Sequence, residues 1–182
     1  MESASRGVGR RVLVIGLAGS GKSTFSRALS MRTGLPVIHL DVHYWRPGWV
    51  KPSEDEWREG QRDLLSGDAW IADGNDLETL DLRLERAESV VLLDTAWWIC
   101  AGRAFLRGLR RPVGWLPPEG CDDSVMRRLR DEWGLAAAIC RSRGSGPEQG
   151  RAIVSKLGGH AALYVLSSKR ASKEFLMALG AD

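Results

Sequence analysis

Short apolar runs alternate along the chain with segments of helical periodicity. The runs predict buried strands over residues 11–15, 36–40, 69–72, 89–93 and 161–166. The segments between and after them predict helices over residues 22–33, 53–66, 77–84, 96–109, 123–141, 148–157 and 172–179. Strands that alternate with helices favour a three-layer α/β/α fold, in which helices cover both faces of a five-stranded parallel sheet. Functional groups are then expected at the carboxyl ends of the strands.

Two helices carry more specific expectations. Ser53 and Glu56 have the spacing of a capping box at the start of the second helix, and Gly34 is placed to end the first. In the helix over residues 123–141, Trp133 and Cys140 fall on one apolar face, and Cys140 is interpreted as a small apolar filler.

Length, composition and charge limit the expected number of domains, the partners and the location of the protein. The 182 residues predict a single domain over residues 11–182, preceded by a flexible arm over residues 1–10 that lacks the apolar core of a signal peptide. The net charge of +3 suits a protein that handles phosphate, and nucleic acid is an unlikely partner because no nucleic-acid-reading motif is present. The three cysteines form no C-x-x-C pair, and no apolar run reaches membrane-spanning length. We expect a cytoplasmic monomer or weak dimer without a membrane partner.

The most specific motif follows the first predicted strand. Residues 16–23 match G-x-x-x-x-G-K-[ST], and a helix is predicted directly after them, which is the context of a phosphate-binding loop. Lys22 would reach the β- and γ-phosphates of ATP, and the Ser23 hydroxyl would bind Mg²⁺. The predicted nucleotide contacts are Gly16, Ala18, Gly19, Ser20, Gly21, Lys22, Ser23 and Thr24, together with Arg103 from a later helix.

Asp41 ends the second predicted strand and opens an aromatic, basic loop over residues 42–49. A carboxylate at this edge could accept a proton from an attacking hydroxyl or bind the acceptor, and the alternative is a capping residue. His43, Tyr44 and Arg46 could stack against the acceptor or bind its charge. The equally weighted alternative is a lid folded over its own hydrophobic core.

Asp73 and Asn75 follow the third predicted strand beside the expected phosphate site. Asp73 could hold magnesium-bound water, and Asn75 could bind the acceptor; the alternative is an ordinary Asp-Gly turn. Asp94 ends the next strand, and we rank it second to Asp73 for the metal, because hydrophobic strands often end in Asp.

No acidic residue occurs between Thr95 and Pro118, whereas Arg103 and Arg107 are spaced to share one helix face. Like charges on one face favour an anion between them, and a transferring phosphoryl group is such an anion. The alternative is a solvated basic helix end. We predict that both arginines are catalytic and that a short lid covers about residues 103–122.

The chain resembles the adenylate-kinase-like branch of P-loop small-molecule and nucleoside monophosphate kinases, and within it the bacterial FlaR-like group. The motifs that carry this resemblance are the phosphate-binding loop and residues 35–41, 43–49, 70–75 and 80–83. The resemblance implies a sheet order of 2-3-1-4-5, a mobile arginine-bearing lid, and an acceptor-side position for Arg83. The Pro-Arg pair that adenylate kinases carry after the third strand is absent here.

Together these features predict an ATP- and Mg²⁺-dependent kinase that acts on a small-molecule acceptor, nucleoside- or nucleotide-like. The alternative is a nucleotide-dependent regulatory or nucleic-acid-associated protein without kinase turnover. A GTPase is disfavoured because no Asn-Lys-x-Asp element follows a strand.

Overall fold

The computed structural model describes residues 7–47, 50–74, 76–109, 125–142, 148, 151–152, 154–155 and 159–179. Its centre is one five-stranded parallel sheet in the order β2-β3-β1-β4-β5, which confirms the predicted fold class and strand order. The strands are β1 (Arg11–Gly16), β2 (Val37–His39), β3 (Trp70–Asp73), β4 (Ser89–Leu93) and β5 (Ala162–Leu166).

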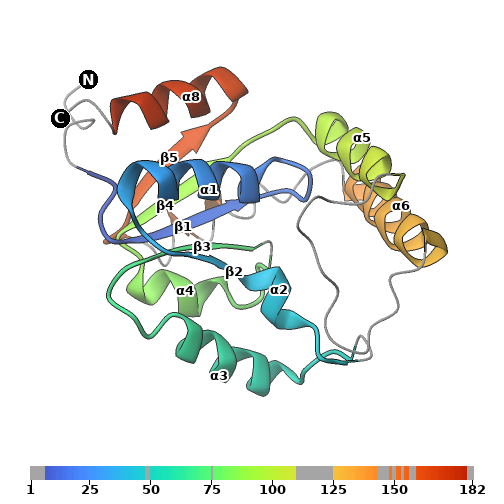
Figure 1. Ribbon diagram of the computed structural model, residues 1–182, viewed down its shortest axis with the longest axis horizontal. Coiled ribbons are helices and arrows are strands. Elements are labelled where there is room, and N and C mark those ends of the chain that lie inside the picture. The colour runs from blue at the N-terminus through green and yellow to red at the C-terminus, as the bar shows by residue number, and fades with distance from the viewer. Residues whose placement is uncertain are drawn as a thin grey trace.

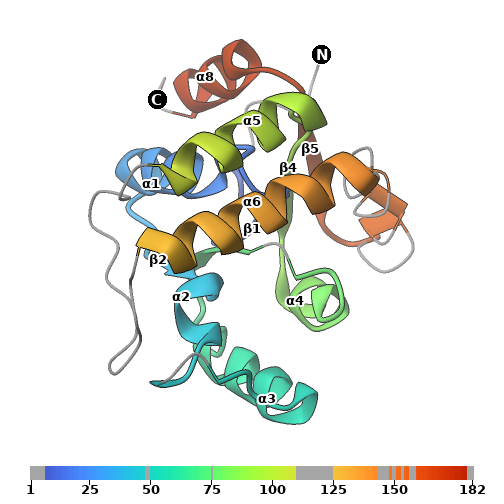
Figure 2. The same cartoon turned by 90° about the vertical axis from the view of Figure 1, so that its right-hand side faces the viewer.

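Helices cover the sheet on both faces. In the described part of the chain they include α1 (Lys22–Thr33), α2 (Leu40–Tyr44), α3 (Glu54–Leu64), α4 (Leu80–Arg86), α5 (Trp97–Gly108), α6 (Val125–Ser142) and α8 (Lys169–Ala178). Helices α1 and α8 lie on one face, and α3 and α4 on the other (Figure 1). Helices α5 and α6 lie side by side at the end of the sheet where α2 begins (Figures 1 and 2).

Alternation along β1 divides the core into two layers. Val12 and Val14 pack with Phe25 and Leu29 of α1, whereas Leu13 and Ile15 pack with α4 and with the end of α3 on the opposite face. All four β1 side chains are at most 2% exposed, and burial of each contributes roughly 1.5–3 kcal/mol. The central strand is thereby fixed, and with it the phosphate-binding loop that follows.

The predicted helix ends are confirmed. The Ser53 main-chain N–H donates to Glu56 Oε2 at 2.8 Å, and the Glu56 N–H donates to Ser53 Oγ at 3.3 Å, which completes the capping box of α3. Gly34 ends α1 in the left-handed conformation with φ 72°, where a side chain would be strained.

Three boundary or packing predictions were wrong. Residues 40–44 form the short helix α2 instead of a strand end and loop. Helix α8 begins at Lys169, three residues before the predicted start, because Ser168 Oγ accepts a hydrogen bond from the Ala171 N–H and caps it. Helix α6 buries Ala136 and Ile139, and it leaves Trp133 and Cys140 exposed.

The predicted lid and the chain ends are only partly described. Val8 is 3% exposed and packs in the core, so the packed body begins three residues before the predicted domain boundary. Residues 110–122 of the predicted lid and much of the helix predicted over 148–157 lie outside the described residues, as does Asn75. Among the described helices, none combines the length and apolar character needed to span a membrane.

Candidate active site

The phosphate-binding loop joins β1 to α1 in a shape that favours glycine. Gly16, Gly19 and Gly21 have φ angles of 148°, 83° and 101°, which side chains other than hydrogen rarely allow. A Cβ atom on Gly19 would lie 2.5 Å from the main-chain oxygen of Cys100 in α5. The loop is therefore held closely against α5.

Lys22 turns its ammonium group back onto this loop. The residue is 7% exposed, and Nζ donates to the main-chain oxygens of Gly16 at 2.9 Å and Leu17 at 3.1 Å. Burial lowers the pKa of Lys22, while the charges of Asp41 and Asp73 oppose that shift. A buried cation held by neutral carbonyl oxygens gains from a nearby anion, so this group is suited to bind phosphate.

The remaining loop residues predicted to contact nucleotide surround this lysine. Ser23 and Thr24 are exposed in the first turn of α1, and Ala18 is half-buried. Ser20 is buried, and its hydroxyl oxygen has no hydrogen-bond partner in the described part of the chain. The exposed hydroxyl of Ser23 is free to reach a ligand from the helix N-terminus.

The two predicted catalytic arginines have different partners. Arg103 Nη1 donates to the main-chain oxygens of Gly19 at 3.1 Å and Ser20 at 3.4 Å. Arg107 makes a bidentate pair with Glu132 of α6, with both nitrogen–oxygen distances 2.7 Å. The structure thus places Arg103 at the phosphate-binding loop and pairs Arg107 with a carboxylate between α5 and α6.

Asp73 lies at the carboxyl end of β3 and is buried. Its Oδ1 is 2.7 Å from Nδ1 of His39, which is its register partner on β2. This contact raises the pKa of His39. The other oxygen, Oδ2, is buried without a hydrogen-bond partner among the described residues, and it is therefore a candidate ligand for a cation or for cation-bound water.

Asp94, the second-ranked metal candidate, lies at the end of β4 and is already paired. Its Oδ2 is 3.1 Å from Nη2 of Arg151. Both aspartates therefore have a basic partner, and they differ in that the buried Oδ2 of Asp73 has no hydrogen-bond partner among the described residues.

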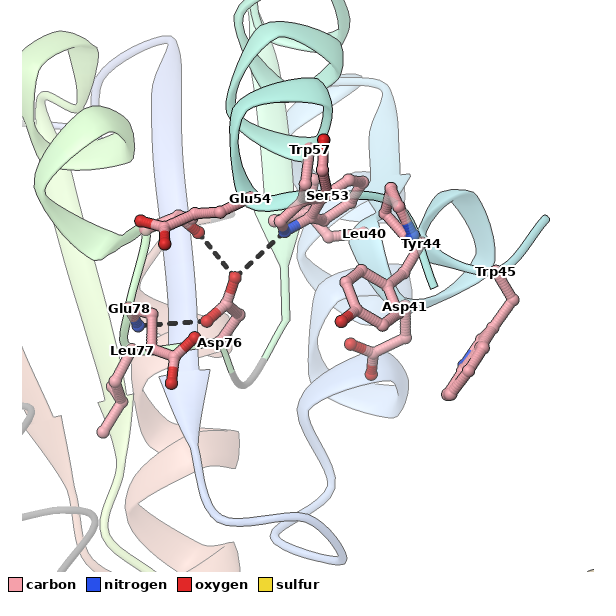
Figure 3. A pocket seen from close by; sticks show the side chains of 12 residues that line it. Leu40, Asp41, Tyr44, Trp45, Ser53, Glu54, Trp57, Asp76, Leu77 and Glu78 are labelled. Atoms are coloured by element: carbon pink, nitrogen blue, oxygen red, sulfur yellow. Dashed lines mark hydrogen bonds between the residues drawn. The ribbon is translucent and has the colours of Figure 1, made fainter. Parts of the chain in front are cut away.

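A cavity of about 700 Å³ opens beside Asp41. Its lining residues come from α2, from the start of α3 and from the segment before α4 (Figure 3). They are Leu40, Asp41, Tyr44, Trp45, Pro52, Ser53, Glu54, Trp57, Asp76, Leu77, Glu78 and Thr79. The Tyr44 ring meets the Trp45 and Trp57 rings edge to face, with centroids 5.2 and 5.1 Å apart. Aromatic faces and carboxylates therefore share one wall.

Asp41 connects the cavity to the phosphate-binding loop. Desolvation by the surrounding protein raises the pKa of Asp41, and the positive charge of Lys22 opposes that shift, while the charge of Asp73 adds to it. The carboxylate thus lines the cavity and also lies within the electrostatic reach of the loop lysine.

Asp76 holds the far wall of the cavity in place. Its Oδ2 accepts from Trp57 Nε1 at 3.0 Å and from Thr79 Oγ1 at 2.7 Å, and its Oδ1 accepts from the Glu78 N–H at 3.0 Å (Figure 3). Gln61 Nε2 donates to Thr79 Oγ1 at 2.8 Å and extends this network into α3. The network fixes the Trp57 ring and the loop after β3 relative to each other.

The predicted acceptor-side residues divide into two groups. Asp41 and Tyr44 line the cavity. His43 is exposed on α2 and does not line it, and Arg46 Nη2 is 3.1 Å from Glu56 Oε1 at the start of α3. Sequence reasoning missed Trp57 and Asp76, although the Trp57 N–H needs an acceptor when it is buried.

Arg83 lies on α4 behind the cavity wall and is 1% exposed. Its Nε donates to the Thr79 main-chain oxygen at 3.5 Å, while Nη1 and Nη2 are buried with no hydrogen-bond partner in the described ranges. Desolvation lowers the pKa of Arg83 to about 10, although Asp76, Asp41 and Asp81 oppose it. The guanidinium therefore supplies positive charge behind two cavity carboxylates at a cost in folding free energy.

Replacing Arg83 with methionine is expected to raise the free energy of unfolding by about 1–3 kcal/mol, because an apolar side chain of similar volume removes a poorly compensated buried charge. Turnover is expected to fall, because the Asp41 and Asp76 carboxylates lose a nearby cation. Urea unfolding and steady-state kinetics on the same preparation test both effects. Destabilisation by several kcal/mol would mean that the guanidinium is well compensated, contrary to the structure.

The sheet order and the flanking helices define a three-layer α/β fold with a phosphate-binding-loop motif after β1, and solved kinases share this fold. Shikimate kinase from Acinetobacter baumannii, solved in complex with shikimate, aligns with a TM-score of 0.51 and 18% identity, over 93% of this chain and 89% of that chain. A candidate kinase from Chloroflexus aurantiacus aligns with a TM-score of 0.51 and 19% identity, over 93% and 96%. These likenesses establish the fold. No protein-family model matches the chain, and no curated protein sequence matches it.

Proposed function

We propose that this protein transfers the γ-phosphoryl group of ATP to a hydroxyl of a small-molecule acceptor bound in the cavity beside Asp41. The observation that carries the proposal is the position of Asp41. It lines the cavity and interacts electrostatically with Lys22 of the phosphate-binding loop. A group between a phosphate-binding loop and a concave site is where an acceptor hydroxyl would be oriented. The kinase fold of the neighbours supports this reading.

Magnesium fits the residues present. The orphaned Oδ2 of Asp73 and the exposed hydroxyl of Ser23 are oxygen ligands of the type that Mg²⁺ prefers. No set of three or more Asp, Glu, His or Cys side chains in the described ranges is grouped to hold a metal alone. This suits an ion that arrives with the nucleotide, because Mg²⁺ commonly uses one or two protein ligands together with waters and phosphate oxygens. Bound there, the ion would neutralise phosphate charge.

The chain's own residues would divide the chemistry. The acceptor oxygen attacks the γ-phosphorus as the bond to the leaving ADP oxygen breaks, and Asp41 takes the acceptor's proton. Lys22 and the loop amides hold the phosphates, and Arg103, at the loop rim, neutralises charge on the transferring group. Arg107 would act in the same way only when released from Glu132.

The type of acceptor and its contacts can be proposed in more detail. Tyr44, Trp45 and Trp57 offer surfaces on which a nucleoside-like acceptor could stack. We also propose the adenylate-kinase-like grouping and the relation to the FlaR-like group. His43, Arg46 and Asn75 would contact the acceptor, whereas Arg83 would act on it through the wall carboxylates, because the guanidinium is buried behind them. We further propose a lid over residues 103–122, a single domain over residues 11–182, and a monomeric or weakly dimeric cytoplasmic state.

The proposal is tested by measuring ADP release from Mg-ATP in the presence of nucleosides, nucleotides, sugars, amino sugars and hydroxy acids. Acceptor-stimulated release with a phosphorylated product supports it. ATP binding without stimulation by any acceptor would instead favour a nucleotide-dependent regulatory protein. A DNA-binding titration against salt concentration then tests nucleic acid as the partner of that alternative.

A further inference from the structure

The cavity wall is rich in negative charge. Asp41, Glu54, Asp76 and Glu78 all line it, and the twelve described lining residues include no Lys, Arg or His. The four carboxylates come from α2, from the first turn of α3 and from the segment before α4 (Figure 3). They line one open cavity together with three aromatic side chains. Asp41, Glu54 and Glu78 are exposed to solvent, and Asp76 is half-buried.

Two arginines near this wall form ion pairs with acidic residues outside the cavity. Arg46 pairs with Glu56, and Arg58 makes a two-bond pair with Asp81; neither of these acids lines the cavity. Among the described residues, two buried cations act on this wall: Arg83 lies behind Asp76 and Asp41, and Lys22 acts on Asp41. Two cations offset at most two of the four carboxylates. The space that faces the acceptor therefore keeps a negative potential.

At least one of the carboxylates is held in its charged form. Burial alone would raise the pKa of Asp76, but the hydrogen bonds from Thr79, Trp57 and the Glu78 amide outweigh it and lower the pKa. An anionic acceptor, such as a nucleotide or a hydroxy acid, would bring its charge against this wall and lose affinity.

The aromatic side chains favour the opposite charge. Tyr44, Trp45 and Trp57 line the same space, with Tyr44 and Trp45 half-buried and Trp57 7% exposed. Ring faces attract cations, and Trp is the most effective. Carboxylates and aromatic rings together are the combination that binds an ammonium group and stacks on the carbon skeleton beside it.

We infer that the acceptor carries a protonated amine close to the hydroxyl that is phosphorylated, as an amino sugar or amino alcohol does. The inference rests on the proposed function, because it takes this cavity as the acceptor site. It narrows the earlier expectation: a nucleotide-like acceptor is disfavoured, and the amine is held between the Asp76 side of the cavity and the aromatic rings while the hydroxyl points to Asp41.

The test compares skeletons that differ only in charge. Glucosamine, glucose and glucuronate form one series, and serinol, glycerol and glycerate form a second. Binding is followed by quenching of tryptophan fluorescence, since Trp45 and Trp57 line the cavity, and turnover is followed by ADP release. The expected order in both assays is amine above neutral above acid. Equal or tighter binding of the neutral or acidic members, or no difference between series members, overturns the inference.

A paired variant tests which residues supply the charge. The double change Glu54→Gln and Glu78→Gln is expected to weaken binding of the amine members roughly tenfold, since two charge pairs with the amine are lost, and to leave binding of the neutral members nearly unchanged. Glu59→Gln, exposed on the same helix α3 but outside the cavity, is the matched control and should change neither. An unchanged preference in the double variant contradicts the inference.

The two proposals fail in distinguishable ways. If the amine members bind selectively but no acceptor stimulates ADP release, the charge selectivity holds and the kinase function fails. If glucose or glucuronate is the better substrate, the kinase function holds and the inference fails.

Discussion

Replacing Lys22 with alanine is expected to lower kcat on the order of a thousandfold. The ammonium group is buried and bound to the loop carbonyls of Gly16 and Leu17, so it is positioned before any nucleotide arrives. Its charge lies in a site with little water, where electrostatic stabilisation of the transferring phosphoryl group is strongest. ADP release with the best acceptor, measured at saturating Mg-ATP, checks the loss.

Two controls separate this effect from misfolding. Lys51→Ala removes an exposed lysine outside the loop and the cavity, and it should retain full activity. Lys22→Met keeps most of the side-chain volume and removes only the charge, so it should unfold near the wild-type temperature and still lose turnover. Wild-type activity in either Lys22 variant would show that the loop lysine is not part of the chemistry.

The sheet and the loop after β1 were predictable because local sequence determines them. The apolar runs of the central strands β1 and β4 are buried on both faces, and a short continuous apolar run is the pattern expected of such a strand. The glycine spacing of the loop follows from backbone angles and from the contact of Gly19 with α5. In such cases one residue type satisfies both the local geometry and the global packing.

Helix α2 was not predictable in the same way. It has five residues, and its N-cap residue, His39, makes no side-chain capping hydrogen bond, so the usual start signal is missing. Its position depends on Leu40, which is 2% exposed and packs where a Cβ atom on Gly74 would come within 3.1 Å. A contact across 34 positions of sequence, with no periodic signal, determines the helix and therefore the orientation of Asp41.

The contacts that form the cavity wall could not be predicted from the sequence either. Trp57 has the spacing of a buried helix residue, and Asp76 has that of a turn residue, but their hydrogen bond joins segments 19 residues apart. The pairing of Arg107 with Glu132 likewise depends on how α6 packs against α5. The sequence shows which side chains are charged, whereas tertiary packing decides which of these charges remain available to a ligand.

Replacing Asp41 with asparagine is expected to lower kcat/KM by roughly a hundredfold to ten-thousandfold, the range lost when a general base is removed. The amide keeps the shape and can still accept a hydrogen bond from the acceptor hydroxyl, but it cannot take the proton. Asp63→Asn, exposed on α3, is the matched control and should retain wild-type kinetics. Initial rates across acceptor concentrations give kcat and KM separately for each variant.

The pH dependence distinguishes the two roles that Asp41 can have. Desolvation raises the pKa of Asp41 above that of an ordinary aspartate, so the ionised form that accepts a proton predominates only when the pH exceeds this raised pKa. In the wild-type protein, kcat/KM should therefore fall as the pH decreases through a limb that lies above the usual Asp range. The Asp41→Asn variant should lose that limb. If the variant keeps the limb and changes KM alone, Asp41 orients the acceptor by hydrogen bonding, and the proton leaves by another route.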